Sequence, residues 1–327
     1  MSASAYQCCV CGEIEGKTHV AREMMSGLRE PFTYFECANC GCLQLLDVPK
    51  NLGRFYGNNY YSFDATQFSS SAWRSFGRKL LTAGEVFRIP GLRAACRRRR
   101  GRSPHLESLA YLRPKPGMAI LDVGCGDGNV LYLLRELGFR AEGVDKFIPR
   151  HITDQYGIRV HSVDLSEIQG KWDLIMFHHS LEHIPEHHKV LGLVRKRLNP
   201  EGRCLIRMPV AEEAWRIYGI NWVQLDAPRH LILHTIRSFR ILAEQSGFLV
   251  EQCYCDSDEF QFWGSELYKR DIPLREGGPH LFTANQLYAF QKNATILNQH
   301  HIGDQGVFVL RQAGENTADS RREVCCH

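Results

Sequence analysis

The residues whose types and spacing first indicate chemistry are three alternating glycines, Gly124, Gly126 and Gly128. A short apolar run that contains Asp122 precedes them, and a helical pattern follows. Glycine is required where the backbone passes close to a ligand or adopts a positive φ angle. Asp145 follows at the end of a second apolar run, where nucleotide-binding sheets place an acid that grips a ribose diol. The pattern therefore predicts a site for a nucleoside-like ligand.

The glycine spacing favours one class of ligand over another. A dinucleotide fingerprint, G-x-G-x-x-G, would need a glycine where Asn129 stands, so the cradle for a pyrophosphate is not predicted. The segment instead resembles the (L/V)-D-(V/I)-G-x-G-x-G motif of class I S-adenosylmethionine-dependent methyltransferases. Further pieces of that family's pattern follow in order: Val163-Asp164, KWDLIMFHHSL at 171–181, LEHIP at 181–185 and LNPEGR at 198–203. An NAD-binding domain is the alternative.

The resemblance implies an α/β fold with a Rossmann-like, doubly wound sheet of seven strands, and S-adenosyl-L-methionine as the cofactor. It assigns one group of residues to the methionine end of the cofactor: Asp122, Gly124, Cys125, Gly126, Asp127 and Gly128. It assigns Asp145 to the ribose, and Asp164 and Leu165 to the adenine. We expect His178 and His179 to flank the methyl-transfer point, because open sheets bind ligands at the carboxyl ends of their strands.

A general base is sought among the histidines, whose pKa lies close to neutral pH. The segment W-x-x-L-D-x-P-R-H-L at 222–231 resembles a bacterial subgroup, the methyltransferase 23 family, that often carries an N-terminal zinc ribbon. In it, Asp226 could orient His230 as the base while Arg229 binds an acidic group of the substrate. Alternatively, Asp226 and Arg229 pair with each other and hold the loop. The candidate catalytic residues are therefore His230, His179 and Asp226.

Other histidines near the fourth expected strand are given structural roles. His183 belongs to the LEHIP turn, and His187 and His188 are expected on an exposed helix. The run His179-x-x-Glu182-His183 also resembles the E-x-x-E-H metal site of some O-methyltransferases. Histidine replaces its first glutamate and no further ligand is evident, so a second metal is not predicted.

Six of the 13 cysteines fall within the first 42 residues. Cys8-x-x-Cys11 and Cys37-x-x-Cys40 form two knuckles, the spacing at which four thiolates complete a closed tetrahedral zinc site. Such a site is structural, because it leaves no open position for catalysis. Cys9 could replace Cys8, and Cys42 could replace Cys40.

The composition of the chain bears on its binding partners and on its cellular compartment. The chain has 327 residues, 44% hydrophobic residues and a net charge of +4, which argues neither for nor against nucleic acid. No signal peptide or membrane-spanning run is apparent, and the odd cysteine count speaks against a secreted disulfide framework. A cytoplasmic protein without a membrane partner is therefore expected. The sequence does not indicate an oligomeric state.

Four regions are predicted: a zinc ribbon at 1–48, an aromatic and basic connector at 49–102, a methyltransferase domain at 103–312 and a disordered tail at 313–327. In the connector, Tyr60 and Tyr61 either pack or cover the cofactor pocket. The arginines at 93–102 are a solvated run or bind phosphate. Helices are expected at 129–136, 235–245 and from the Thr283-x-x-Gln286 capping box to 298, and late strands at 249–254 and 306–310.

The resemblance implies a methyltransferase that acts on a small molecule. O-methylation of a sugar, glycan or secondary metabolite is the leading hypothesis, because the chain is too short for the further C-terminal domain of sugar C-methyltransferases. An RNA base methyltransferase is the first alternative, since some pair a zinc ribbon with this fold. A cofactor-binding partner without catalysis, in a biosynthetic complex, is the second.

Overall fold

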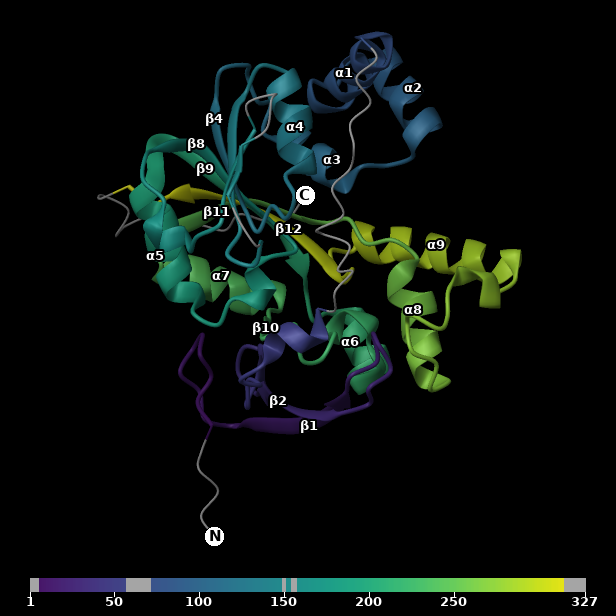
Figure 1. Ribbon diagram of the computed structural model, residues 1–327. Helices are drawn as coiled ribbons and strands as arrows, with labels where there is room; N and C mark the ends of the chain where they lie inside the picture. The colour runs from purple at the N-terminus through teal and green to yellow at the C-terminus, as the bar shows by residue number, and fades with distance from the viewer. Residues whose placement is uncertain (1–5, 57–71, 149–150, 154–157, 315–327) are drawn as a thin grey trace.

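The computed structural model describes residues 6–56, 72–148, 151–153 and 158–314 of the chain. In Figure 1, helices α1 and α2 lie at the top of the molecule and strands β1 and β2 lie at the bottom. A large central sheet lies between them (Figure 1). The predicted Tyr60-Tyr61 segment and the tail from residue 315 onward lie outside the described residues. None of the described helices is long and apolar enough to cross a membrane.

The central sheet has eight strands in the order β11-β12-β9-β8-β4-β5-β7-β6. Strands β4, β5, β7, β8 and β9 run parallel, while β12 is antiparallel to both β9 and β11. This is the Rossmann-like sheet that the sequence predicted, with the two-residue β6 added beyond the seventh strand. The strands are β4 Ala119–Val123, β5 Arg140–Val144, β6 Ile152–Thr153, β7 Arg159–His161, β8 Trp172–His178, β9 Leu198–Pro209, β11 Phe248–Cys255 and β12 Gln305–Gln312.

Helices cover both faces of this sheet because its central strands are buried on both sides. Alternate residues of β4 belong to different cores: Ile120 packs with α3 and α4, whereas Leu121 packs with α5 and α7. The helices are α1 Ala72–Val86, α2 Pro90–Arg100, α3 Pro104–Tyr111, α4 Asn129–Glu136, α5 His187–Arg197, α6 Glu213–Tyr218, α7 Ile236–Gln245, α8 Phe260–Lys269 and α9 Ala284–Gln299.

Local signals in the sequence locate several helix ends. Helix α4 spans the predicted residues, and the predicted N-caps Thr235 and Thr283 both form capping boxes. The prediction for His187 was wrong: its side chain is buried and contacts His234, with 2.8 Å between Nδ1 and Nε2. The neighbouring His188 is exposed as expected. A histidine at the first turn of an amphipathic helix can face either way, and the sequence did not reveal its partner.

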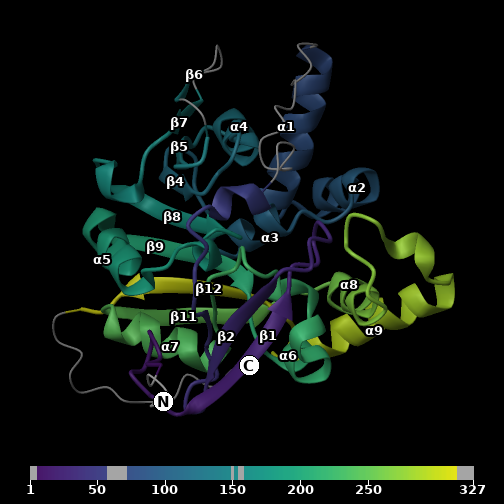
Figure 2. The ribbon, with the colours of Figure 1, turned by 60° about the horizontal axis from the view of Figure 1, so that its bottom comes forward.

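A second sheet joins the cysteine-rich segment to the part of the chain that follows β9. It has the order β1-β2-β3-β10, with β1 Gly16–Arg22, β2 Pro31–Cys37, β3 Leu43–Leu45 and β10 Ile232–Leu233. In Figure 2, β1 and β2 lie at the front, between α7 and α6. Residues of the cysteine-rich segment, such as Tyr34 and Leu43, share one apolar core with Phe177 and Phe239. The cysteine-rich segment is therefore packed onto the central sheet rather than tethered to it.

Candidate functional site

The glycine loop between β4 and α4 requires glycine at particular positions. Gly124 has a φ of +75°, and a Cβ on it would lie 2.4 Å from the Cβ of Ser180. Gly128 has a φ of +84° and forms the N-cap of α4. These positive φ angles are costly for other residues. The loop therefore brings unobstructed backbone to the carboxyl ends of β4 and β8.

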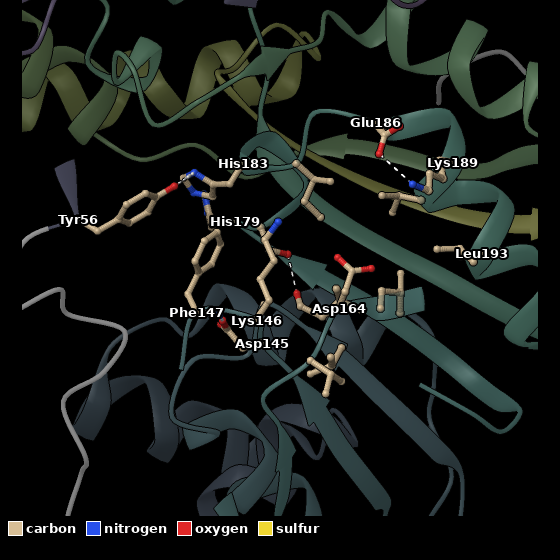
Figure 3. Close-up of a pocket in the computed structure, with 18 of the residues that line it drawn as sticks. Tyr56, Asp145, Lys146, Phe147, Asp164, His179, His183, Glu186, Lys189 and Leu193 are labelled. Carbon is tan, nitrogen blue, oxygen red and sulfur yellow. Dashed lines mark hydrogen bonds and ion pairs between the residues drawn. The ribbon is translucent and has the colours of Figure 1, made fainter. Parts of the chain in front are cut away.

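A cavity of about 330 Å³ lies beside this loop and falls in the range of about 300–1,000 Å³ that is usual for small-molecule sites. Figure 3 shows Asp145, Asp164, His179 and His183 at its wall. The residues that line it are Gly53, Tyr56, Val123, Gly124, Val144, Asp145, Lys146, Phe147, Val163, Asp164, Leu165, His179, Ser180, His183, Ile184, Glu186, Lys189, Val190 and Leu193. The cavity thus brings Gly124, Asp145, Asp164, Leu165 and His179 of the predicted site together.

The carboxylate of Asp145 is oriented by backbone amides on both sides. Its Oδ2 accepts a hydrogen bond from the amide of Gly126 at 3.0 Å, and its Oδ1 accepts one from Phe147 at 2.9 Å. Each oxygen keeps a further lone pair for a ligand. Asp164 instead caps the short helical turn that contains Leu165, and its Oδ1 accepts from both the amide and the hydroxyl of Ser166. Both acids line the cavity, but Asp145 is held by two backbone amides, whereas Asp164 is held by the amide and hydroxyl of Ser166.

Several predicted cofactor residues do not line the cavity. Asp122 is buried in β4, and the loop residues Cys125, Gly126, Asp127 and Gly128 are not among the lining residues. Burial, together with the nearby Asp145 carboxylate, raises the pKa of Asp122 to about 8. The structure therefore places the Asp122 carboxyl in the interior at β4 rather than at the cavity wall.

We predict that Asp122→Asn makes the ligand-free protein more stable than the wild type, by an amount that grows with pH. A carboxyl group with a raised folded-state pKa stabilises fully below its unfolded pKa, near 3.8, and loses that contribution as pH rises toward about 8. Asparagine has no such loss. Thermal unfolding of both proteins between pH 5 and pH 8 checks this, and a difference that does not change with pH would contradict it.

His178 and His179 point to different surroundings although they are neighbours at the end of β8. His178 is buried against His105, with 4.7 Å between ring centroids, and is not among the cavity residues. His179 lines the cavity, and its Nε2 contacts Nη1 of Arg207. Because Arg207 can only donate, Nε2 of His179 is the acceptor and Nδ1 carries the proton. That Nδ1 lies 3.4 Å from Oε1 of Glu182.

The loop that contains His230 lies behind His183, whose ring centroid is 4.9 Å from that of His230. Asp226 pairs with Arg229, which is the structural alternative considered for these two residues. His230 is oriented by the carbonyl of Gln224, 2.7 Å from its Nδ1, and its Nε2 is 3.7 Å from Oδ2 of Asp226. The predicted orienting contact from Asp226 is therefore supplied by a backbone carbonyl, which carried no signal in the sequence.

The four predicted cysteine ligands come together in the structure. Their sulfur atoms all lie within 4.8 Å of one another, and the Sγ atoms of Cys8 and Cys40 are 3.5 Å apart, as are those of Cys11 and Cys37. All four are free thiols. Cys9 is exposed and Cys42 lies outside the cluster, so the structure selects the first-named ligand in both ambiguous pairs.

Two aromatic residues of the cavity were not predicted as site residues. Tyr56, from the connector, stacks on Phe147 with 5.8 Å between ring centroids. The position of Phe147, two residues after Asp145 at the end of β5, was the signal that could have identified it. The sequence did mark the connector as aromatic, and Tyr56 brings it to the cavity.

Comparisons with known proteins point to one family. Residues 96–252 match the family model described as a methyltransferase domain. The chain is 27% identical over 131 residues to a ubiquinone biosynthesis O-methyltransferase of Azorhizobium caulinodans, a match covering 36% of this chain and 52% of that protein. It is 28% identical over 102 residues to the protein of the same name from Paramagnetospirillum magneticum, covering 28% and 41%. The chain thus spans about half, or less, of the length of the curated relatives it matches.

Among solved structures, the chain is similar to a 1,6-didemethyltoxoflavin-N1-methyltransferase from Burkholderia thailandensis. The sequences are 14% identical, the match covers 85% of this chain and 97% of that one, and the TM-score is 0.42. The matched segment 96–252 contains the glycine loop, Asp145, Asp164 and His230. Residues 96–252 of the chain therefore carry the methyltransferase domain that the sequence predicted.

Proposed function

We propose that this protein is an S-adenosylmethionine-dependent O-methyltransferase that acts on a small molecule, with a sugar, glycan or secondary metabolite as the acceptor. The observation that carries the proposal is the cavity in which Gly124, Asp145 and Leu165 meet His179 and His183. The curated relatives, both named as O-methyltransferases, support oxygen as the acceptor atom.

The residues present fit the cofactor. Gly124 leaves room that a Cβ would fill, Asp145 offers a carboxylate to a ribose diol, and Val163 and Leu165 offer apolar surface to an adenine. When bound, S-adenosylmethionine supplies an electrophilic methyl group. The chain's own contribution is to hold an acceptor oxygen in line with that methyl group and to exclude water. His179 and His183, on the wall next to Gly124 and Ser180, are the residues we assign to the acceptor side.

The cysteine cluster fits a structural zinc ion. Four sulfurs at about 2.3 Å from one zinc ion lie about 3.8 Å apart, and the observed contacts of 3.5 Å are close to that value. We propose that this zinc holds the ribbon against the His230 loop. Two hydrogen bonds cross this junction: Tyr34 donates to the carbonyl of His230 at 2.8 Å, and Thr235 donates to that of Cys40 at 2.7 Å.

The arginines at 93–102 support an RNA substrate less than the sequence alone indicated. Arg93 contacts Glu85, Arg102 contacts Glu107, and Arg97 contacts both acids. Arginines engaged in this way brace α1, α2 and α3 and offer less charge to phosphate. The experiment that tests the proposal is transfer of labelled methyl groups to a cell extract. We expect the label in small molecules or glycans; label in ribonuclease-sensitive polymer would overturn the proposal.

We predict that His230→Ala lowers the turnover number by about 100-fold, because the His230 ring packs against His183 and a small misplacement of a residue at the reacting centre has this effect. Affinity for S-adenosylmethionine should stay within about twofold, because His230 lies behind the wall formed by His183. Steady-state kinetics with calorimetry separate the two effects. The control is His188→Ala, which removes an exposed histidine of α5. Full activity in His230→Ala would show that the loop has no part in the reaction.

A further inference from the structure

Glu182 is a fully buried carboxylate whose two oxygens have no hydrogen-bond partner among the described residues. It lies in the short turn after β8, next to the cavity-lining His183. A buried carboxylate normally pairs with a charge or accepts hydrogen bonds, because burial without compensation is expensive. The nearest ring N–H is that of His179, whose Nδ1 is 3.4 Å from Oε1. The carboxylate therefore needs a further partner.

Two histidines next to Glu182, His183 and His230, each use Nδ1 in a hydrogen bond to a backbone carbonyl. Nδ1 of His183 lies 2.9 Å from the carbonyl of Arg229, and Nδ1 of His230 lies 2.7 Å from that of Gln224. A carbonyl can only accept, so both rings are protonated at Nδ1 and carry the lone pair at Nε2. A histidine that donates one ring N–H to a backbone carbonyl is the arrangement that orients metal ligands in proteins.

The distances suit a shared ion better than direct hydrogen bonds. Nε2 of His230 is 4.0 Å from Oε1 of Glu182 and 3.7 Å from Oδ2 of Asp226. Hydrogen bonds would be about 2.7–3.2 Å long, whereas two ligands bound to one ion at about 2.1 Å lie about 3.0–4.2 Å apart. One ligand atom each from Glu182, His183 and His230 lies within 4.8 Å of the others.

We propose that Glu182, His183 and His230 form a second metal site, which binds a divalent first-row transition cation at the wall of the cavity. Two imidazoles and a carboxylate suit such a cation better than magnesium or calcium, which prefer oxygen ligands alone. His179 is not a ligand, because Arg207 occupies its Nε2 and its Nδ1 carries a proton directed at Glu182. Asp226 is already paired with Arg229, and its Oδ2, 3.7 Å from Nε2 of His230, adds negative charge beside the site.

The position of the metal site suggests that the cation binds the acceptor. This assignment rests on the proposed O-methyl transfer. His183 lines the cavity, so a cation held by it would be reachable from the acceptor side. A cation with three protein ligands keeps open positions, which a hydroxyl oxygen of the acceptor can occupy. The acceptor class that follows is a hydroxyl compound able to bind a metal.

The test measures binding of Mn²⁺ alone to the full-length protein, without cofactor or acceptor, after its zinc content has been determined. Mn²⁺ is chosen because it does not displace zinc from a thiolate site. Loss of the free-ion electron paramagnetic resonance signal should show one Mn²⁺ bound per chain, and added Zn²⁺ should displace it. Glu182→Gln and His230→Ala should each weaken binding at least about 10-fold.

The matched control is Glu186→Gln, which removes an exposed carboxylate that pairs with Lys189 on the same cavity. It should bind Mn²⁺ like the wild type. Unchanged ribbon zinc in Glu182→Gln shows that this variant is folded. If the wild type binds no Mn²⁺ at about 1 mM, or if Glu182→Gln binds it as well as Glu186→Gln does, the site does not exist. This test does not measure methyl transfer. A protein that binds Mn²⁺ but transfers no methyl group would contradict only the proposed function, and one that transfers methyl groups but binds no Mn²⁺ would contradict only the metal site.

Discussion

Replacing Cys40 with serine is expected to lower the melting temperature of this protein by on the order of 10 °C, through the loss of several kcal/mol of metal-linked stability. The expected loss is large because the ribbon is not a separate module. Cys40 is buried in the same core as Phe177 and Phe239, and its carbonyl accepts a hydrogen bond from Thr235. Losing the metal should therefore loosen β3 and its partner β10 together.

Differential scanning calorimetry with a measurement of bound zinc checks this prediction. Cys9→Ser is the matched control, because Cys9 lies in the other knuckle of the ribbon but is exposed and outside the sulfur cluster. It should keep its zinc and its melting temperature. Equal losses in the two variants, or a Cys40→Ser protein that melts like the wild type, would show that the cluster does not hold a structural zinc.

Asp145→Asn is expected to weaken binding of S-adenosylmethionine by about 30- to 100-fold. The estimate follows from about 2–3 kcal/mol for the charge-assisted hydrogen bonds that a carboxylate makes with a diol. Asparagine keeps one carbonyl oxygen for the amide of Phe147 or Gly126, which both bind the native carboxylate, but it loses the charge. Most of the loss should therefore come from the ligand rather than from unfolding of the loop.

Isothermal titration calorimetry of Asp145→Asn measures this effect directly. Glu142→Gln is the control, since Glu142 lies on the same strand, pairs with Arg159 and His161, and does not line the cavity. Its affinity should match that of the wild type. If both variants bind the cofactor with native affinity, Asp145 does not hold the ribose.

Features that depend on neighbouring residues were well predicted from the sequence. The glycine loop, the start of α4 and the caps at Thr235 and Thr283 each depend on residues within one turn of chain, so their pattern is visible in the sequence. The cysteine knuckles are local in the same way, and the structure brings all four together. The fold class followed from the order of these local signals.

Features that depend on contacts between distant segments were not predicted. His230 lies far along the chain from Glu182 and His183, so their approach depends on the loop that follows β9. That loop is held by β10, a two-residue strand whose pairing with β3 leaves no periodic pattern. The burial of His187 against His234 has the same origin. In each case a short segment acquires its role only when the ribbon packs onto the central sheet.

The central claim is that the cavity beside Gly124 binds S-adenosylmethionine rather than a dinucleotide. The most direct measurement is calorimetric titration of the wild-type protein with S-adenosylhomocysteine and, separately, with NAD. The account predicts one site per chain for S-adenosylhomocysteine, with a micromolar dissociation constant, and no heat of binding for NAD. Binding of NAD without binding of S-adenosylhomocysteine would contradict it.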